Sequence, residues 1–201
     1  MLRRALITVG VFTGVYLVGF GALALARGNG EFLFYIAVML VLIGLVTVLD
    51  TRVRIPAPLL WALSVWGLLH VAGGTVPIPT VLADVQGQPV LYSLWLVPGL
   101  LRYDNIVHAY GFGVATLVCH AAIRDLLADP DRVSFGLALA VALMGLGLGA
   151  LNELVEFAAT RLIPETNVGG YVNTGWDLVA NTVGASIAAA LLWLRHHRPT
   201  R

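Results

Sequence analysis

Hydrophobic residues gather into six long runs in this chain, separated by shorter stretches rich in charge, proline or glycine. A helix needs about 20 apolar residues to cross roughly 30 Å of hydrocarbon. The third run is short and relies on flanking residues, whereas the fifth is long enough to carry its polar end beyond the hydrocarbon. The pattern predicts an all-α polytopic bundle of six transmembrane helices, forming one transmembrane domain over residues 1–201. The predicted helices are 5–26, 32–49, 59–72, 105–123, 133–160 and 174–194.

Composition supports this class and removes others. The chain has 201 residues, of which 59% are hydrophobic and 11% charged, too apolar for a soluble core of this size. All twelve basic residues are arginine and the formal net charge is +1, so nucleic acid is not an expected partner. A single cysteine, Cys119, excludes an intrachain disulfide and a thiolate metal cluster.

The arginines predict the orientation, because cytoplasmic loops of membrane proteins carry an excess of positive charge. With an inside amino terminus, nine arginines lie on the inner side and three on the outer side, which places both termini in the cytoplasm. The first run also resembles a signal peptide, but its apolar length favours a retained helix. The inner arginines are Arg3, Arg4, Arg52, Arg54, Arg124, Arg132, Arg195, Arg198 and Arg201, and the outer ones are Arg27, Arg102 and Arg161.

In this topology, the ionisable residues within or beside the last four runs all lie at the outer ends of their helices. Their spacing also places those of one helix on a common face, since Asp104 and His108 are four residues apart and Glu153 and Glu156 are three apart. We therefore expect a small polar chamber that opens to the outer leaflet. Its expected members are His70, Asp104, His108, Glu153, Glu156 and Asp177.

The chemistry of such a chamber favours a metal ion. An ionised carboxylate in hydrocarbon costs at least about 2.5 kcal/mol, so Glu153 and Glu156 need a proton or a cation. Two imidazoles with three or four carboxylates suit zinc, manganese or iron better than calcium or magnesium. All six residues are candidate metal ligands, and Glu153 or Glu156 is also the candidate general base. Asn152 and Asn181 are expected to support these ligands through hydrogen bonds.

Simpler interpretations exist for several of these residues. Asp104 is close in sequence to Arg102 and would then be an interfacial ion pair. His70 precedes Gly73 and Gly74, which end the helix and would leave the imidazole among the headgroups. Asp177 would be an N-terminal helix cap. The glutamate pair is hardest to explain in this way, because no basic residue follows it before Arg161.

Two outer segments carry further expectations. Residues 90–101 are apolar but too short to span, and contain Tyr92 and Trp95, which predicts an interfacial or re-entrant segment. Residues 167–175 contain Asn167, Asn173 and two adjacent glycines just before Asp177. A glycine-rich turn at a helix start binds anions such as phosphate, although a plain turn is the commoner explanation.

Glycine spacing predicts where helices approach closely. Gly145 and Gly149 form a small-residue ridge one turn before Glu153, which would press the fourth and fifth helices together below the polar level.

The order of these motifs resembles a known family. Asp104-x-x-x-His108, the acidic Glu153 and Glu156, and Asp177-x-x-x-Asn181-x-x-Gly184 resemble VanZ-like membrane proteins. Residues 103–108, Trp176-Asp177 and the preceding His70 are closer to the YjdF-type bacterial inner-membrane proteins. The chain departs from the VanZ-like pattern at Asn105 and Glu156, where Lys and Gln are usual. The resemblance implies a multi-pass protein of a bacterial or archaeal inner membrane, in a cell-envelope setting, but no reaction.

Two functions remain open. In the first, a metal held by the polar residues activates water or a phosphate of a lipid or lipid-linked substrate at the outer leaflet, as in a metal-dependent intramembrane hydrolase or lipid-headgroup enzyme. The residues expected around the substrate are Asn152, Asn167, Asn173 and Asn181. In the second, the protein is an ion- or proton-coupled carrier whose carboxylates titrate or bind a cation. Against the carrier, the polar residues stop at one side and no inverted repeat is evident.

Overall fold

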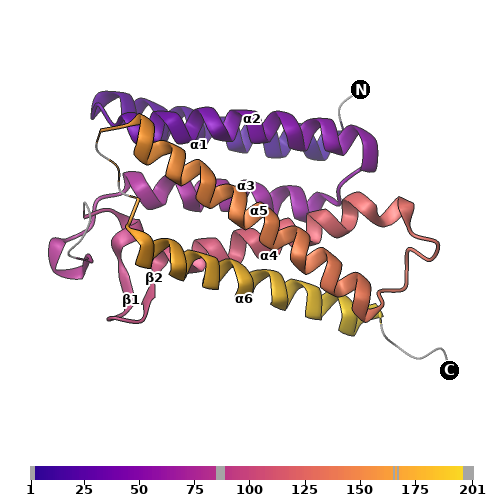
Figure 1. Cartoon of the computed structure of the whole chain (residues 1–201). Helices are drawn as coiled ribbons and strands as arrows, with labels where there is room; N and C mark the ends of the chain where they lie inside the picture. The colour runs from indigo at the N-terminus through magenta and orange to yellow at the C-terminus, as the bar shows by residue number, and fades with distance from the viewer. Residues whose placement is uncertain (1–2, 85–88, 165, 167, 197–201) are drawn as a thin grey trace.

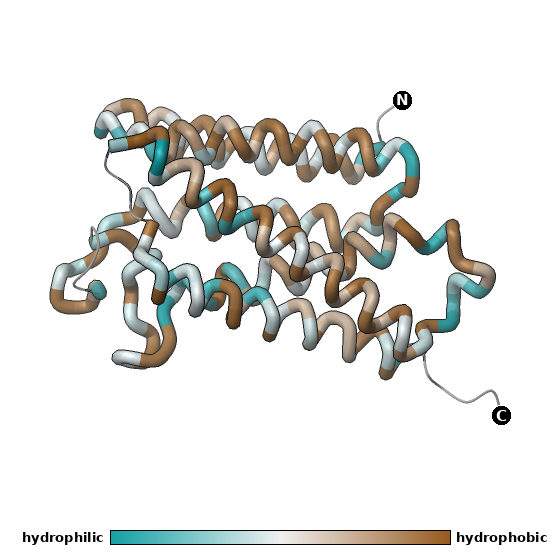
Figure 2. The backbone as a smooth tube through the Cα atoms, viewed as in Figure 1, coloured by the Kyte–Doolittle hydropathy of each residue, from teal (hydrophilic) through white to brown (hydrophobic). Residues whose placement is uncertain are grey.

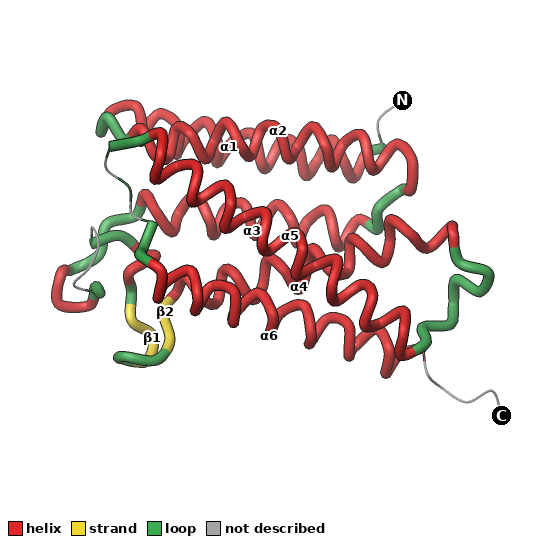
Figure 3. Tube along the Cα trace, in the orientation of Figure 1, coloured by secondary structure: helices red, strands yellow, loops and turns green. Residues whose placement is uncertain are grey.

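The computed structural model describes residues 3–84, 89–164, 166 and 168–196. Six helices in this part of the chain are long and apolar enough to cross a bilayer, which confirms the predicted all-α multi-pass fold. Figures 1 and 3 show them side by side, with the ends of the chain on one side of the bundle. They are α1 (Arg4–Ala26), α2 (Gly30–Val53), α3 (Ala57–Thr75), α4 (Tyr103–Ile123), α5 (Phe135–Leu162) and α6 (Tyr171–His196).

Helix α4 is the central helix and α2 the most peripheral. In the most apolar stretch of each helix, 56% of the residues of α4 are buried, against 11% for α2. Helix α4 packs against α3, α5 and α6, whereas α1 packs mainly on α3 and α2. Residues 40–45 of α2 are exposed on every side of the helix over more than one turn. Figure 2 shows hydrophobic residues along the helices and hydrophilic ones gathered towards both ends.

Glycines allow the central helices to approach each other. A Cβ atom at Gly184 of α6 would lie 1.9 Å from the backbone oxygen of Ala109 in α4, so the two backbones touch there. A Cβ atom at Gly145 would lie 1.9 Å from Oγ1 of Thr116, and one at Gly149 would contact Asn181. The predicted close packing of the fourth and fifth helices is confirmed at Gly145, whereas Gly149 packs against α6.

One ion pair ties together the ends of the first three helices that lie near the amino terminus of the chain. Arg3 contacts the buried carboxylate of Asp50 at the end of α2, and its guanidinium donates to the backbone oxygen of Ile55 at 2.7 Å. This pair lies at the opposite end of the bundle from the predicted polar chamber.

The connection between α3 and α4 builds a structured cap at the end of the bundle where the predicted polar residues lie. It contains two 3₁₀ helices, η1 (Thr80–Leu82) and η2 (Leu91–Ser93), and a hairpin of strands β1 (Trp95–Val97) and β2 (Leu101–Arg102). In Figure 1 the hairpin projects sideways from the bundle beside the start of α6. The segment 90–101 therefore forms a 3₁₀ turn and a hairpin rather than a further helix.

Candidate metal centre

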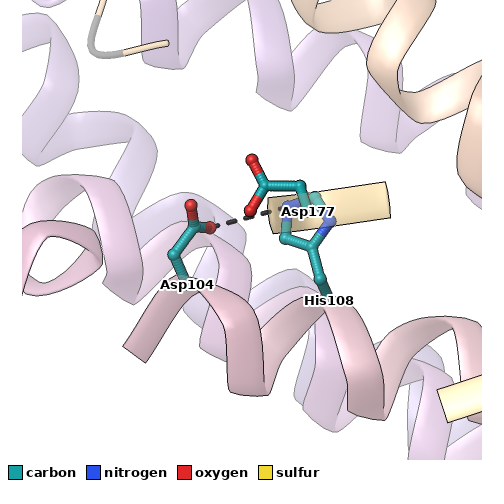
Figure 4. Close-up of side chains that lie close together, drawn as sticks. All are labelled: Asp104, His108 and Asp177. Atoms are coloured by element: carbon teal, nitrogen blue, oxygen red, sulfur yellow. Dashed lines mark ion pairs between the residues drawn. The ribbon is translucent and has the colours of Figure 1, made fainter. Parts of the chain in front are cut away.

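The polar side chains of α4 are placed by the way this helix begins. The Asn105 side chain accepts a hydrogen bond from the backbone N–H of Arg102 at 3.0 Å and so caps the helix start. Its amide then donates to Asp177 of α6 at 3.4 Å. Asp104 and His108, four residues apart, project from the same face of α4, and Figure 4 shows Asp177 facing them from α6.

His108 is the centre of the cluster, and its protonation can be deduced from its neighbours. The amide nitrogen of Asn181 faces Oε1 of Glu153 at 3.4 Å, and a carboxylate only accepts, so this nitrogen is the donor. Oδ1 of Asn181 therefore faces Nδ1 of His108, at 3.0 Å, and Nδ1 must carry a hydrogen. In a neutral imidazole the lone pair is then on Nε2.

That lone pair points at two acids. Nε2 of His108 lies 3.5 Å from Oδ1 of Asp104 and 3.8 Å from Oε1 of Glu156. Both distances exceed those of ordinary N–H···O hydrogen bonds, about 2.7–3.2 Å. They are close to the separation of about 3.4 Å between two ligands that each lie about 2.1 Å from a tetrahedral ion. The arrangement needs positive charge between these atoms, either a proton or a metal ion.

Two overlapping groups have metal-binding geometry. One ligand atom from each of Asp104, His108 and Asp177 lies within 4.8 Å of the others, and the same holds for His108, Glu153 and Glu156. His108 belongs to both groups, so the three helices α4, α5 and α6 meet at its ring. Five of the six expected ligands are therefore together.

Asp177 is completely buried and is held by amides. Its Oδ1 accepts from Asn105 and its Oδ2 accepts from Asn173 at 2.5 Å. Asn173 in turn accepts a hydrogen bond from the guanidinium of Arg102, whose ion-pair partner is Asp84 at 3.5 Å. Arg102 thus positions an amide beside the site and does not pair with Asp104, contrary to the simpler interpretation of that acid.

The two glutamates of α5 differ in their surroundings. Oε1 of Glu156 accepts a hydrogen bond from the Asn152 amide, one turn earlier, at 2.8 Å. Oε2 of Glu153 is buried and has no hydrogen-bond partner among the described residues. A buried oxygen without a partner costs about 1–3 kcal/mol, more if it is charged. Asn152 and Asn181 therefore lie where the sequence predicts supporting residues, each beside a carboxylate.

His70 lies at the edge of the cluster and belongs to neither metal-capable group. Its Nδ1 is hydrogen-bonded to the hydroxyl of Tyr92, which reaches it from η2, so only Nε2 is available to a metal or water. Burial raises the pKa of the Tyr92 phenol well above 10, so the hydroxyl stays protonated. His70 and Tyr92 line a small cavity of about 40 Å³ together with Asp104 and Glu156.

Two residues of α2 that line this cavity, Glu31 and Tyr35, are not among those predicted from the sequence. Glu31 is buried although it lies in the first turn of its helix, where an acid usually stabilises the helix dipole in solvent. The available signal was its position in the topology, because the second helix begins at the same end of the bundle as the other acids.

The segment before α6 is only partly described. Asn167 lies outside the described residues. Asn173 lies inside the first turn of α6, and both polar atoms of its side chain are used by Arg102 and Asp177. Anion binding by this segment remains a prediction.

Comparison with known proteins gives one match. A family model described as "Predicted membrane protein (DUF2238)" matches residues 8–198. No curated protein and no solved structure matches the chain. YjdF-type proteins are a DUF2238 family, so that part of the resemblance is confirmed, whereas the VanZ-like part is not shown. The chain belongs to the DUF2238 family of predicted membrane proteins.

Proposed function

We propose that this protein binds a divalent metal ion between α4, α5 and α6. The observation that carries the proposal is His108, whose Nδ1 is hydrogen-bonded to Asn181 while Nε2 faces Asp104 and Glu156 at 3.5 and 3.8 Å. Nitrogen with carboxylate oxygens is the donor set of zinc, manganese and iron sites. The proposed ligands are His108, Glu153 and Glu156, one of the two groups with suitable spacing, with Asp104 or Asp177 completing the coordination.

The charge around His108 supports a divalent ion over a single proton. Asp104, Glu153, Glu156 and Asp177 are four carboxylates, and none forms an ion pair with an arginine in the described part of the chain. A protonated His108 would offset only one negative charge. A divalent ion would offset two and would also occupy the space beside Nε2.

The metal would act on a lipid or lipid-linked substrate of the cell envelope. The Asp104 and Glu156 side chains each retain 13% exposure, about twice that of His108, so the ion would be approached from their side. A cavity of about 40 Å³ holds one or two waters but not a headgroup. The substrate would therefore remain at the bilayer surface. There the metal would supply Lewis-acid chemistry at a phosphate, and Glu156 or Glu153 would take the proton of the attacking water as the phosphate ester bond breaks and its alcohol leaves.

This proposal assumes the orientation and membrane predicted from the sequence. With both termini in the cytoplasm of a bacterial or archaeal cell, the site would face the outer leaflet of the inner membrane.

The test is the element content of protein purified in detergent without added metal. The wild type is compared with Glu153→Gln/Glu156→Gln and with Asp129→Asn/Asp131→Asn, which removes two acids from an exposed loop at the other end of the bundle. About one equivalent of zinc, manganese or iron in the wild type and the loop variant, lost in the glutamate variant, is the expected result. No metal in any of the three overturns the proposal and favours the proton-coupled carrier.

A further inference from the structure

The hairpin β1–β2 has an unusual tip for a segment outside the membrane-spanning helices. Residues 96–100 are all exposed, and none of the five carries a polar side chain. Leu96, Val97 and Leu100 are 47%, 44% and 62% exposed. The tip therefore presents a continuous apolar surface.

A loop at the opposite end of the same bundle shows the contrast. Residues 124–132 are also largely exposed, but five of these nine positions carry a charge. Such a charged composition is typical of a loop in water, whereas the hairpin tip carries no charged side chain. The charged positions are Arg124, Asp125, Asp129, Asp131 and Arg132.

The backbone of the tip is also suited to an apolar environment. Val97 to Leu100 form a tight turn in which the N–H of Leu100 donates to the oxygen of Val97 at 3.0 Å. Pro98 has no N–H to satisfy, and Gly99 supplies the positive φ of 72° that this turn requires. At Pro98 and Leu100, therefore, no N–H is left to face the surroundings, which lowers the cost of leaving water.

The hairpin lies beside the first turn of α6. Its base is joined to the first turn of α6, because the guanidinium of Arg102 donates to Asn173. Nearby in α6, Tyr171 and Trp176 are exposed, as in the aromatic belts that mark the boundary of a bilayer. In Figure 1 the hairpin extends sideways at this level, whereas the segment around η1 extends beyond the helix ends.

We infer that the β1–β2 hairpin is a lipid-contacting element that inserts its tip into the bilayer beside α6. Leu96, Val97 and Leu100 enter the acyl boundary. The Arg102 guanidinium, 5.9 Å from the centre of the Trp95 ring, stays at the headgroup level. The occupant is lipid because the tip continues the lipid-facing surface of α6, which is exposed at Trp176 and Val179.

Spin-label depth measurement in liposomes tests this inference. In a Cys119→Ala background, a nitroxide is attached at Leu100→Cys or, separately, at Val97→Cys. The controls are Leu154→Cys, on the exposed apolar side of α5, and Asp129→Cys, in the charged loop. The expected ratio of oxygen to nickel-chelate collisions at both hairpin sites is several-fold above that at Asp129→Cys and approaches that at Leu154→Cys.

Two results would overturn the inference. Nickel access equal to that at Asp129→Cys places the tip in water. Protection from both reagents means that protein, such as a second copy of the chain, covers it. The metal content of the same preparations tests the proposed function separately, because the tip residues touch none of the proposed ligands. An unlabelled variant that fails to purify as a monodisperse species is replaced by the other hairpin position.

Discussion

Oδ1 of Asn181 lies 3.0 Å from Nδ1 of His108, in the completely buried contact between α6 and α4. The same amide donates to Glu153, so one side chain fixes the orientation of a ring and of a carboxylate on two other helices. This contact determines which imidazole nitrogen is free to bind a metal.

Replacing Asn181 by Ala should weaken metal binding without removing any ligand. Nδ1 would lose its acceptor, and the loss of such a supporting contact typically costs 10- to 100-fold in affinity. Competition with a chelator of known affinity measures this effect. Thr182→Ala, at the neighbouring and exposed position of α6, is the control and should retain the wild-type affinity. Equal metal affinities for the two variants would show that Asn181 does not support the metal site.

Glu153→Gln should change thermal stability in opposite directions with and without metal. Without metal, the substitution removes a buried acid whose Oε2 has no partner among the described residues and that faces other carboxylates. A gain of about 1 kcal/mol would raise the midpoint by roughly 2–4 °C. With saturating metal the variant should be less stable than the wild type, because binding stabilises the folded state. The unfolding midpoints of the variant and the wild type are measured in chelator and in excess metal. If the midpoint of the variant shifts in the same direction in both, Glu153 has no metal role.

Gly184→Ala should disrupt the site by separating two helices. The new Cβ would lie 1.9 Å from the Ala109 backbone oxygen, an overlap that only helix movement can relieve. Overpacking of this kind costs about 1–3 kcal/mol, and here it would also lengthen the contact between His108 and Asn181. Gly175→Ala is the matched control, since no atom lies within 4 Å of its Cβ position in the same helix. The expected result is lower stability and metal content for Gly184→Ala alone.

The predicted orientation can be tested with single cysteines in a Cys119→Ala background. Val81 is 86% exposed in the segment between α3 and α4, and Asp129 is exposed in the loop between α4 and α5. A membrane-impermeant maleimide should label Val81→Cys in intact cells and Asp129→Cys only after permeabilisation. The reverse pattern would place both termini outside and the metal site on the cytoplasmic side.

Hydropathy and spacing are sufficient to predict the helices and the end of the bundle at which the acids lie. The i,i+4 relation of Asp104 and His108 and the position of Glu156 depend only on helix geometry, so both could be predicted. Glu31 could not be recognised in the same way, because a single acid in a first turn has an ordinary local explanation. The hydrogen bond between Tyr92 and His70 depends on the path of the irregular segment between α3 and α4. No periodic pattern in the sequence predicts that path.

The hairpin is an intermediate case. The order Val97-Pro98-Gly99-Leu100 is typical of a tight turn, and the sequence alone could have predicted two short strands around it. The apolar composition of the same residues predicts an interfacial or re-entrant segment instead. The interfacial interpretation and the hairpin are compatible, since a closed turn is a form in which an apolar segment can contact lipid.

Residues 40–45 of α2 are exposed on every side of the helix, and this bears on the cavity near the first residues of α2. Its 24 residues are about 36 Å long at 1.5 Å per residue, more than the roughly 30 Å of hydrocarbon in a typical bilayer. A helix of this length adjusts its tilt to the thickness of the membrane. Glu31 and Tyr35 lie near the start of α2 and line the cavity beside His70. We therefore expect the width of this cavity to change with the tilt of α2, and so with the thickness of the host membrane.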